Sequence, residues 1–144
     1  MPIKVFTDGG ASPNPGPGGW AAIVCNGGHP EVELYGGEHD TTNNRMEMMA
    51  FIKGLEYLGD VRQTVTITTD SQYVKNGVTS WVHGWKRRGW LTADGKEVKN
   101  QDLWMRLHDL AQKHDLTVEW VKGHTGHIHN ERCDVLATQG RKEL

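Results

Sequence analysis

Two aspartates occupy equivalent places in the sequence and could share a ligand. Asp8 follows Phe6-Thr7 and Asp70 follows Thr68-Thr69, so each is expected at the end of a strand rich in aromatic or β-branched residues. If these strands are parallel neighbours, the two carboxylates lie side by side at the carboxyl edge of the sheet. Open α/β sheets bind their ligands at that edge.

Glu47 and Asp134 complete a set of four candidate metal ligands. Glu47 lies in an otherwise apolar run, residues 46–52, and is expected to be partly buried. Asp134 is expected in the first turn of the last helix, where the helix dipole favours an anion. Two carboxylates 4 Å apart repel by about 4 kcal/mol at an effective dielectric constant near 20, so this cluster requires cations or protons. Ligands that are all oxygen atoms favour Mg²⁺, with Mn²⁺ as a substitute, over Zn²⁺.

Each acidic residue has a simpler interpretation when it is taken alone. Asp8 or Asp70 could form a turn. Glu47 could close a capping box opened by Asn44, and Asp134 could interact with the helix dipole alone. Clusters that do converge commonly hold two metal ions, which clamp the attacking and leaving oxygens of a phosphoryl transfer. Spacing by itself leaves both interpretations open.

The elements that position these residues follow from hydrophobic periodicity and from turn residues. The segment from 9 to 19 holds five Gly and three Pro and predicts a turn-rich loop. Ser71 is placed to cap a short helix, and Gly59 is placed to end a longer one. Strands are predicted over 3–8, 20–25, 31–35, 65–69 and 116–121. The longer helices are predicted over 44–58, from Asn100 or Asp102 to 110, and from the residue after Asn130 to about 140.

The order β-β-β-α-β-α-α-β-α predicts one α/β domain over residues 1–144. Hairpin strands pair antiparallel and strands joined through helices pair parallel, so a five-stranded mixed sheet is expected, with three antiparallel strands followed by two parallel ones. The sequence has no basic-then-apolar signal peptide and no apolar stretch of membrane-spanning length. We therefore expect a cytoplasmic protein without a membrane partner.

The net charge of −2 hides an uneven distribution. Segment 81–99 has five basic and two acidic residues, a charge of +3, which leaves 11 basic and 16 acidic residues, or −5, for the remainder. Within it, Trp81, Trp85 and Trp90 alternate with the basic triplet Lys86-Arg87-Arg88. These tryptophans could form a local core, or they could stack on sugars and bases while the cations hold phosphates. Composition alone leaves both interpretations open.

A run of histidines close to Asp134 allows two further interpretations. His124, His127, His129 and Cys133 lie within ten residues, which is compatible with a zinc site. No second, closely spaced ligand pair accompanies them, so solvated loop histidines are the simpler explanation. One histidine beside an anionic site could also exchange protons near neutral pH.

The chain contains a set of motifs in a fixed order: Thr7-Asp8-Gly9, Thr42-Asn43-Asn44-Arg45-Met46-Glu47, Thr69-Asp70-Ser71-Gln72-Tyr73, Val121-Lys122-Gly123-His124 and Asn130-Glu131-Arg132-Cys133-Asp134. Taken together, these motifs resemble those of the bacterial type 1 ribonuclease H family. The resemblance spans essentially the whole chain and implies the ribonuclease H-like fold. Two stretches depart from the family pattern, Gly10-Ala11-Ser12-Pro13 and Ile128-His129, and both leave the acidic residues intact.

The resemblance implies a monomeric endonuclease that hydrolyses the RNA strand of RNA/DNA hybrids with two divalent ions, leaving 3′-hydroxyl and 5′-phosphate ends. It implies that Asp8 bridges the two ions, that Glu47 and Asp70 bind on the leaving-group side, and that Asp134 binds near the attacking water. His124 would assist proton transfer or product departure. The implied substrate contacts are Asn14, Asn43, Asn44 and Gln72 in the minor groove and Thr42 at a DNA phosphate. The segment over about 81–99 resembles the basic protrusion of this family, which implies further contacts from Trp81, Trp85, Lys86, Arg87, Arg88 and Trp90.

Two other functions are compatible with the same residues. One is a catalytically idle module that binds hybrids, although binding alone would not retain four mutually repelling carboxylates. The other is a related polynucleotidyl transferase that acts on double-stranded DNA. The amide side chains argue against the second, because they can recognise the 2′-hydroxyl that distinguishes RNA from DNA.

Overall fold

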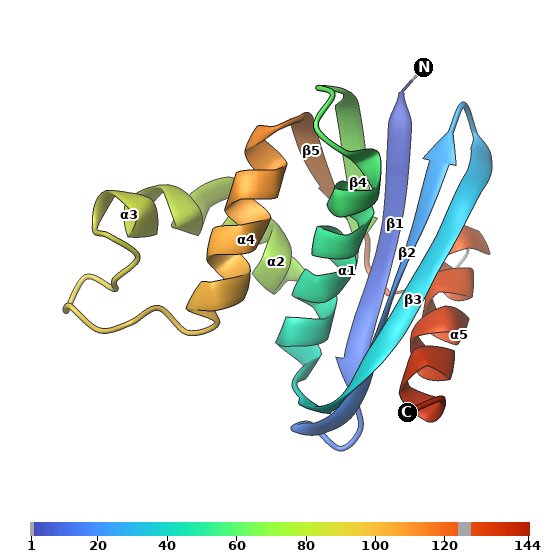
Figure 1. The fold of residues 1–144 in the computed structure, drawn as a ribbon, viewed down its shortest axis with the longest axis horizontal. Helices are drawn as coiled ribbons and strands as arrows, with labels where there is room; N and C mark the ends of the chain where they lie inside the picture. Colours follow the sequence, from blue (N-terminus) through green and yellow to red (C-terminus); the bar gives the residue numbers. More distant parts are fainter. Residues whose placement is uncertain (1, 124–127) are drawn as a thin grey trace.

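The structure, a computed structural model, describes residues 2–123 and 128–144. It contains one five-stranded sheet in the order β3-β2-β1-β4-β5, in which β1, β2 and β3 pair antiparallel and β1, β4 and β5 pair parallel (Figure 1). The predicted single-domain α/β fold with a mixed sheet is therefore confirmed. The strands are β1 Ile3–Ala11, β2 Gly16–Asn26, β3 His29–Thr41, β4 Thr64–Thr69 and β5 Asp115–Trp120; the helices are α1 Asn43–Leu58, α2 Gln72–Asn76, the π-helical turn η1 Gly77–Trp81, α3 Val82–Arg87, α4 Gln101–Gln112 and α5 Ile128–Lys142.

Most of the segment from 9 to 19 is strand, so the prediction of a long loop is wrong. β1 and β2 stay paired as far as Ala11 and Gly18, which leaves the turn itself to residues 12–15. Glycine is required at several of these strand positions because the backbone of a helix lies so close that no Cβ atom would fit. A Cβ atom on Gly9 would be 2.4 Å from the carbonyl carbon of Met46, and one on Gly19 would be 1.9 Å from the carbonyl oxygen of Ala137.

The β2-β3 hairpin is longer than the sequence pattern predicts. Asn26 pairs with His29, so Gly27 and Gly28 alone form the turn, with φ angles of 64° and 86°. Positive φ at both positions is what a two-residue type I′ turn requires. The strands extend beyond the predicted 20–25 and 31–35 because ladder pairing continues through glycine and polar residues, which carry no alternating pattern.

Helix α1 begins two residues earlier than a capping box at Asn44 requires. The Oγ1 atom of Thr42 accepts a hydrogen bond from the backbone N–H of Arg45 at 3.2 Å, so Thr42 is the N-cap. Glu47 therefore takes no part in a capping box and is free to point elsewhere. Gly59 ends the helix with a φ of 74°, as predicted.

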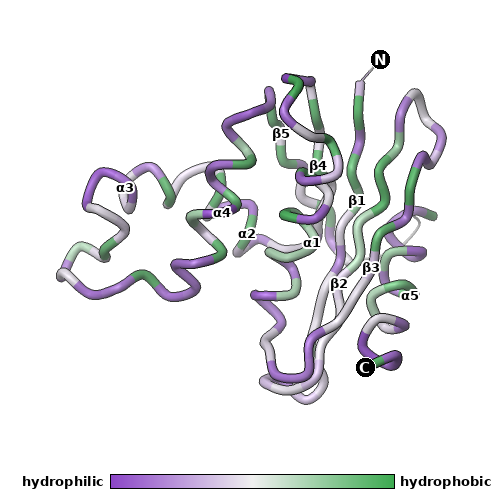
Figure 2. The backbone as a smooth tube through the Cα atoms, in the orientation of Figure 1, coloured by the Kyte–Doolittle hydropathy of each residue, from purple (hydrophilic) through white to green (hydrophobic). Residues whose placement is uncertain are grey.

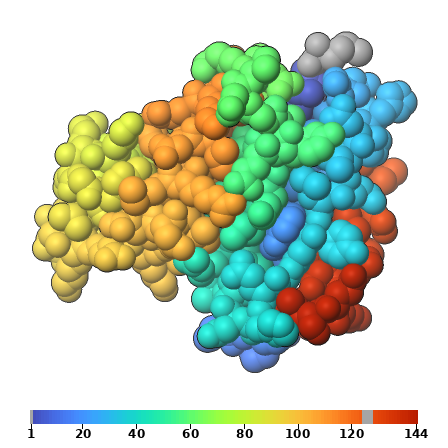
Figure 3. Space-filling model, in the orientation of Figure 1, coloured from blue at the N-terminus to red at the C-terminus, as the bar shows by residue number. Residues whose placement is uncertain are grey.

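Ser71 caps α2 as predicted, because its Oγ accepts from the backbone N–H of Val74 at 3.1 Å. The helical path then continues through η1 and α3, and the chain from α3 to the start of α4 projects to one side of the sheet (Figures 1 and 3). At the base of this projection, Arg45 makes a two-pronged ion pair with Asp102, with N–O distances of 3.0 and 2.8 Å. That pair connects the first turns of α1 and α4.

Two apolar layers enclose the sheet. One lies between the sheet and helices α1 and α4, and its largest fully buried side chains include Trp104 and Phe51. The smaller layer lies under α5 and contains Cys25, Cys133 and Leu136. The hydrophobic positions accordingly follow β1, β2 and the inner helix faces, whereas the projection is mainly hydrophilic (Figure 2). None of the helices in the described part of the chain is long and apolar enough to cross a membrane.

Candidate active site

Asp8 and Asp70 lie at the same level of two neighbouring parallel strands. The β1-β4 register pairs Phe6 with Thr68, and each aspartate comes two residues after its member of that pair. Asp70 follows the end of β4, but Asp8 lies within β1, opposite Ala21 of β2, so it does not end its strand as predicted. Asp8 is 6% exposed. The two carboxylates are adjacent because of the register, as the parallel-neighbour argument predicts.

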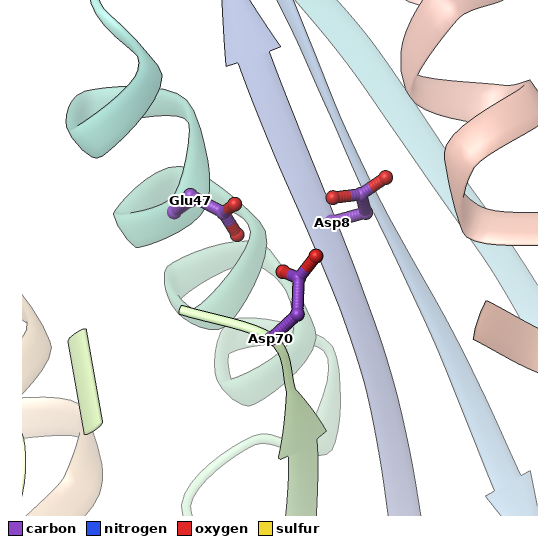
Figure 4. A group of neighbouring side chains, drawn as sticks. All are labelled: Asp8, Glu47 and Asp70. Carbon is purple, nitrogen blue, oxygen red and sulfur yellow. The ribbon is translucent and has the colours of Figure 1, made fainter. Parts of the chain in front are cut away.

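Glu47 approaches the same point from α1. Its carboxylate points toward those of Asp8 and Asp70 (Figure 4), and one oxygen from each of the three residues lies within 4.8 Å of the others. Burial raises the pKa of Glu47 well above its usual value, and the charges of Asp8 and Asp70 raise it further. Its Oε2 atom is buried and accepts no hydrogen bond within residues 2–123 and 128–144.

These three carboxylates fit a divalent cation. The ligand atoms are all oxygens, and the buried Oε2 of Glu47 is an acceptor that a cation would satisfy. Burial first, and the negative charges of Asp8 and Asp70 second, disfavour the charged form of Glu47, and a cation bound here would offset both effects. Hard divalent ions such as Mg²⁺ prefer oxygen ligands of this type.

Asp134 faces the same cleft from the other side of the sheet edge. It is exposed and lies six residues after the first residue of α5, so its predicted place in the first turn is wrong. The helix starts at Ile128 rather than after Asn130, which moves the positive end of the dipole away from Asp134. An interaction with that dipole no longer explains this carboxylate. The cleft has a volume of about 410 Å³ and is lined by Asp134 together with Asp8, Glu47, Asp70, Asn43 and the Gly10–Ser12 backbone, among others.

The predicted minor-groove contacts Asn14 and Asn43 are held together beside the cleft. Oδ1 of Asn14 accepts from the backbone N–H of Asn43 at 3.1 Å, and Oδ1 of Asn43 accepts from the N–H of Ala11 at 2.7 Å. These bonds fix the β1-β2 turn against the start of α1. A neighbouring polar pocket of about 310 Å³ is lined by Asn14, Pro15, Thr42, Asn43, Asn44, Lys99 and Asn100.

Lys99 and Asn100 are polar residues of that pocket that sequence reasoning missed as candidate contacts. Lys99 counted only toward the charge of segment 81–99, and Asn100 only as a helix cap. Asn100 adopts a left-handed conformation with φ of 60° and makes no side-chain cap. Its amide instead donates to the hydroxyl of Tyr73 at 3.1 Å and its Oδ1 accepts from Arg45 at 3.3 Å. In the sequence, Asn100 is an asparagine directly after a basic segment, and that pattern does not distinguish a helix cap from hydrogen bonds to Tyr73 and Arg45.

The protrusion separates its aromatic residues from its cations. Trp85 and Trp90 are half-buried and pack against the core, with the Trp85 ring 5.6 Å from that of Trp104. Trp81 is 40% exposed, and its ring lies 5.7 Å from that of Tyr73 in an edge-to-face arrangement. The basic triplet Lys86-Arg87-Arg88 is largely exposed, and Gln72 is exposed at the start of α2, directly after the acidic edge.

The candidate zinc residues do not form a cluster among the described residues. His124 and His127 lie outside the described residues. The ring of His129 packs 4.9 Å from that of Phe6, and the buried thiol of Cys133 donates to the carbonyl of Phe6 at 3.2 Å. Burial raises the pKa of Cys133, so the thiolate that a zinc ion requires is disfavoured.

Comparisons with known proteins identify the family of this chain. The family model for RNase H matches residues 2–142. The chain is 57% identical over 142 residues to a ribonuclease H of Halorhodospira halophila, covering 99% of this chain and 94% of the relative. It is also 57% identical over 141 residues to a ribonuclease H of Rhodospirillum rubrum, covering 98% and 84% respectively.

Solved structures give the same answer at the level of the fold. The crystal structure of LC9-RNase H1, described as a type 1 RNase H with the type 2 active-site motif, superposes with a TM-score of 0.84 at 31% identity, covering 99% of this chain and 72% of that one. LC11-RNase H1 in complex with RNA/DNA hybrid shares the fold, with a TM-score of 0.74 at 24% identity and coverage of 98% and 97%. With a family model that spans nearly all of its length, this chain belongs to the ribonuclease H family of enzymes.

Proposed function

We propose that this protein is an endonuclease that hydrolyses the RNA strand of RNA/DNA hybrids with the help of two divalent metal ions, leaving 3′-hydroxyl and 5′-phosphate ends. The observation that carries the proposal is the convergence of Asp8, Glu47 and Asp70 within 4.8 Å at one edge of the sheet. Membership of the ribonuclease H family supports the substrate. The LC11-RNase H1 complex supports it too, because a relative of the same fold holds an RNA/DNA hybrid.

In this proposal, each of the four carboxylates has its own part in binding the metal ions. Asp8 lies on β1 between the elements that carry the other carboxylates, so it would help to hold the ions, and its assignment to both of them rests on its resemblance to the family motif alone. One carboxylate oxygen each of Glu47 and Asp70 lies within 4.8 Å of an oxygen of Asp8, and Asp134 lines the same cleft from α5. When bound, the divalent ions neutralise the acidic cluster, activate a water molecule and stabilise the leaving oxygen. His124 is assigned proton transfer or product departure on its resemblance to the family motif alone.

The polar residues beside the cleft are proposed to recognise the hybrid. Asn14 and Asn43 are held in place by their hydrogen bonds to the loop and helix backbones, which orients their remaining polar atoms. Amides of this kind, with Asn44 and Gln72, can both donate to and accept from a 2′-hydroxyl. Thr42 already uses its hydroxyl to cap α1, so its proposed phosphate contact would add a second role to that group.

The protrusion is proposed to hold the hybrid outside the cleft. Its charge of +3 opposes the −5 of the remainder. Lys86, Arg87 and Arg88 are available for phosphates at the surface, and Trp81 offers an exposed aromatic face. Trp85 and Trp90 support this surface from below, since both pack on the core.

The deciding experiment is a cleavage assay with separate labels on the two strands of a hybrid, with and without Mg²⁺. We expect Mg²⁺-dependent cuts in the RNA strand alone, with ends that a polynucleotide kinase and a ligase identify as 5′-phosphate and 3′-hydroxyl. Asp8→Asn and Asp70→Asn should abolish the cuts while leaving the circular dichroism spectrum unchanged. Near-normal cleavage by both variants would contradict the assignment.

The same assay distinguishes the other two functions. Binding of the hybrid without cleavage in Mg²⁺ or Mn²⁺ would indicate an idle binding module. Cleavage of double-stranded DNA under the same conditions would favour a polynucleotidyl transferase. We expect neither, and we expect the active species to sediment as a monomer.

A further inference from the structure

One cation lines the catalytic cleft and has no role in the mechanism described above. Arg141 contributes to the wall that also contains Asp8, Asp134 and Ser12, and it is the single Lys or Arg among the described residues of that wall. Its side chain forms no ion pair with any residue of the described ranges 2–123 and 128–144. Sequence reasoning passed over it because it lies near the C-terminus, outside every motif.

Arg141 and Asp134 occupy the same face of α5. Asp134, Ala137, Thr138 and Arg141 are spaced i, i+3, i+4 and i+7, and all four line the cleft. Seven residues of helix correspond to about 10.5 Å along the axis. The guanidinium is therefore placed further along the cleft than the carboxylates, on the side of the β1-β2 turn. A substrate strand whose scissile phosphate lies at the carboxylates would extend past this position.

The last turn of α5 is held firmly, so Arg141 projects from a fixed backbone. A Cβ atom on Gly19 would be 2.8 Å from the backbone nitrogen of Arg141, and one on Gly37 would be 2.4 Å from the carbonyl oxygen of Gly140. The helix backbone thus rests directly on the glycines of β2 and β3. The hydroxyl of Tyr35 adds hydrogen bonds of 3.2 and 3.0 Å to the carboxylate of Glu143, beyond Arg141.

We infer that Arg141 binds a phosphate of the cleaved strand adjacent to the scissile one, and thereby positions that strand over the acidic cluster. This inference rests on the proposed function, since it assumes that a polynucleotide strand lies along the cleft. The planar guanidinium can hold two phosphate oxygens at once, which suits a fixed anchor better than an ammonium does. Its place beyond Asp134 lets it attract phosphate where the carboxylates alone would repel it.

The test compares Arg141→Gln with Lys142→Gln, an exposed neighbour of equal charge on another face of the helix. We expect Arg141→Gln to raise KM for the hybrid about tenfold with little change in kcat, and to reduce the slope of log KM against log salt by about 0.7 to 0.9. Arg141→Lys should recover part of the loss. Lys142→Gln should stay within about twofold of wild type, because a charge on another face of the helix, exposed to solvent and salt, has only a small screened effect on the cleft.

A second measurement excludes a merely structural role. Hybrids are prepared in which one RNA-strand phosphate at a time is replaced by an uncharged methylphosphonate. Wild type should lose affinity at one position next to the cut, and Arg141→Gln should be indifferent to the replacement at that position alone. If wild type cleaves the hybrid but the two proteins share the same profile, the inference about Arg141 is overturned while the proposed function stands. If wild type does not cleave, the proposed function itself has failed.

Discussion

The acidic cluster should make the metal-free protein less stable, and Glu47→Gln should relieve that effect. One carboxylate oxygen of Glu47 lies within 4.8 Å of an oxygen of Asp8 and of Asp70. If all three groups are charged, each pair repels by at least about 3.5 kcal/mol at an effective dielectric constant near 20. Protonation limits the penalty. At pH 7, protonating a carboxyl group whose usual pKa is 4.5 costs about 3.4 kcal/mol. The charged cluster can therefore lower the free energy of unfolding by no more than this amount.

The sign of the pH dependence follows from the direction of the pKa shift. The pKa of Glu47 is raised in the folded protein, so the folded state keeps this proton to a higher pH than the unfolded state does. Stability is therefore lost as the pH rises from 4.5 through the folded pKa. Glu47→Gln should raise the free energy of unfolding by up to about 1.4 kcal/mol at about pH 5.5 and up to about 3.4 kcal/mol at about pH 7, and should change it little below about pH 4.5.

The assay is thermal unfolding in EDTA at several pH values, with and without excess Mg²⁺. For a chain of this length, 1 kcal/mol corresponds to about 3 °C in Tm. Mg²⁺ at about a hundred times its Kd should stabilise wild type by about 2.7 kcal/mol, and Glu47→Gln should gain much less. The exposed Glu119→Gln serves as the control and should match wild type throughout. Equal stability of Glu47→Gln and wild type at neutral pH in EDTA, or a difference that does not grow with pH, would refute the reasoning.

Three further changes test other parts of the structure. Replacing the basic triplet 86–88 by glutamine should raise KM for the hybrid. It should also reduce the slope of log KM against log salt by about 0.7 to 0.9 for each phosphate that the variant no longer binds. An unchanged slope in steady-state kinetics would contradict the proposed role of the protrusion. Burial, with the charge of Lys86, lowers the pKa of His108 in the folded protein. The free energy of unfolding should therefore fall as the pH drops from about 6.5 through the folded pKa of His108. In urea unfolding, His108→Gln should lose less free energy of unfolding than wild type over that range. In Gly77→Ala the new Cβ would lie 2.0 Å from the ring of Trp104, so urea unfolding should show a loss of about 3 kcal/mol, and a loss below about 0.5 kcal/mol would mean that the ring moves aside freely.

Local sequence was sufficient for features that depend on neighbouring residues. Ser71 and Gly59 mark helix ends because capping is completed within a few residues of the cap. The mixed sheet followed from the order of the elements, since hairpins and helical crossovers permit different pairings. Local signals failed where distant backbone decides the conformation. The glycines between 9 and 19 indicated a loop, yet most are strand residues that let α1 and α5 lie directly on β1 and β2.

The sequence by itself determined which chemical groups this protein can use: four carboxylates in family-like motifs, amide side chains beside them, and a basic segment with three tryptophans. Only the tertiary structure decided which of these groups meet. The register of β1 with β4 brings Asp8 beside Asp70, and the packing of α1 over the sheet brings Glu47 to within 4.8 Å of both. The length of α5 removed Asp134 from the helix dipole and placed Arg141 in the cleft. These distances depend on contacts between residues far apart in the chain, and no local pattern of residues encodes such contacts.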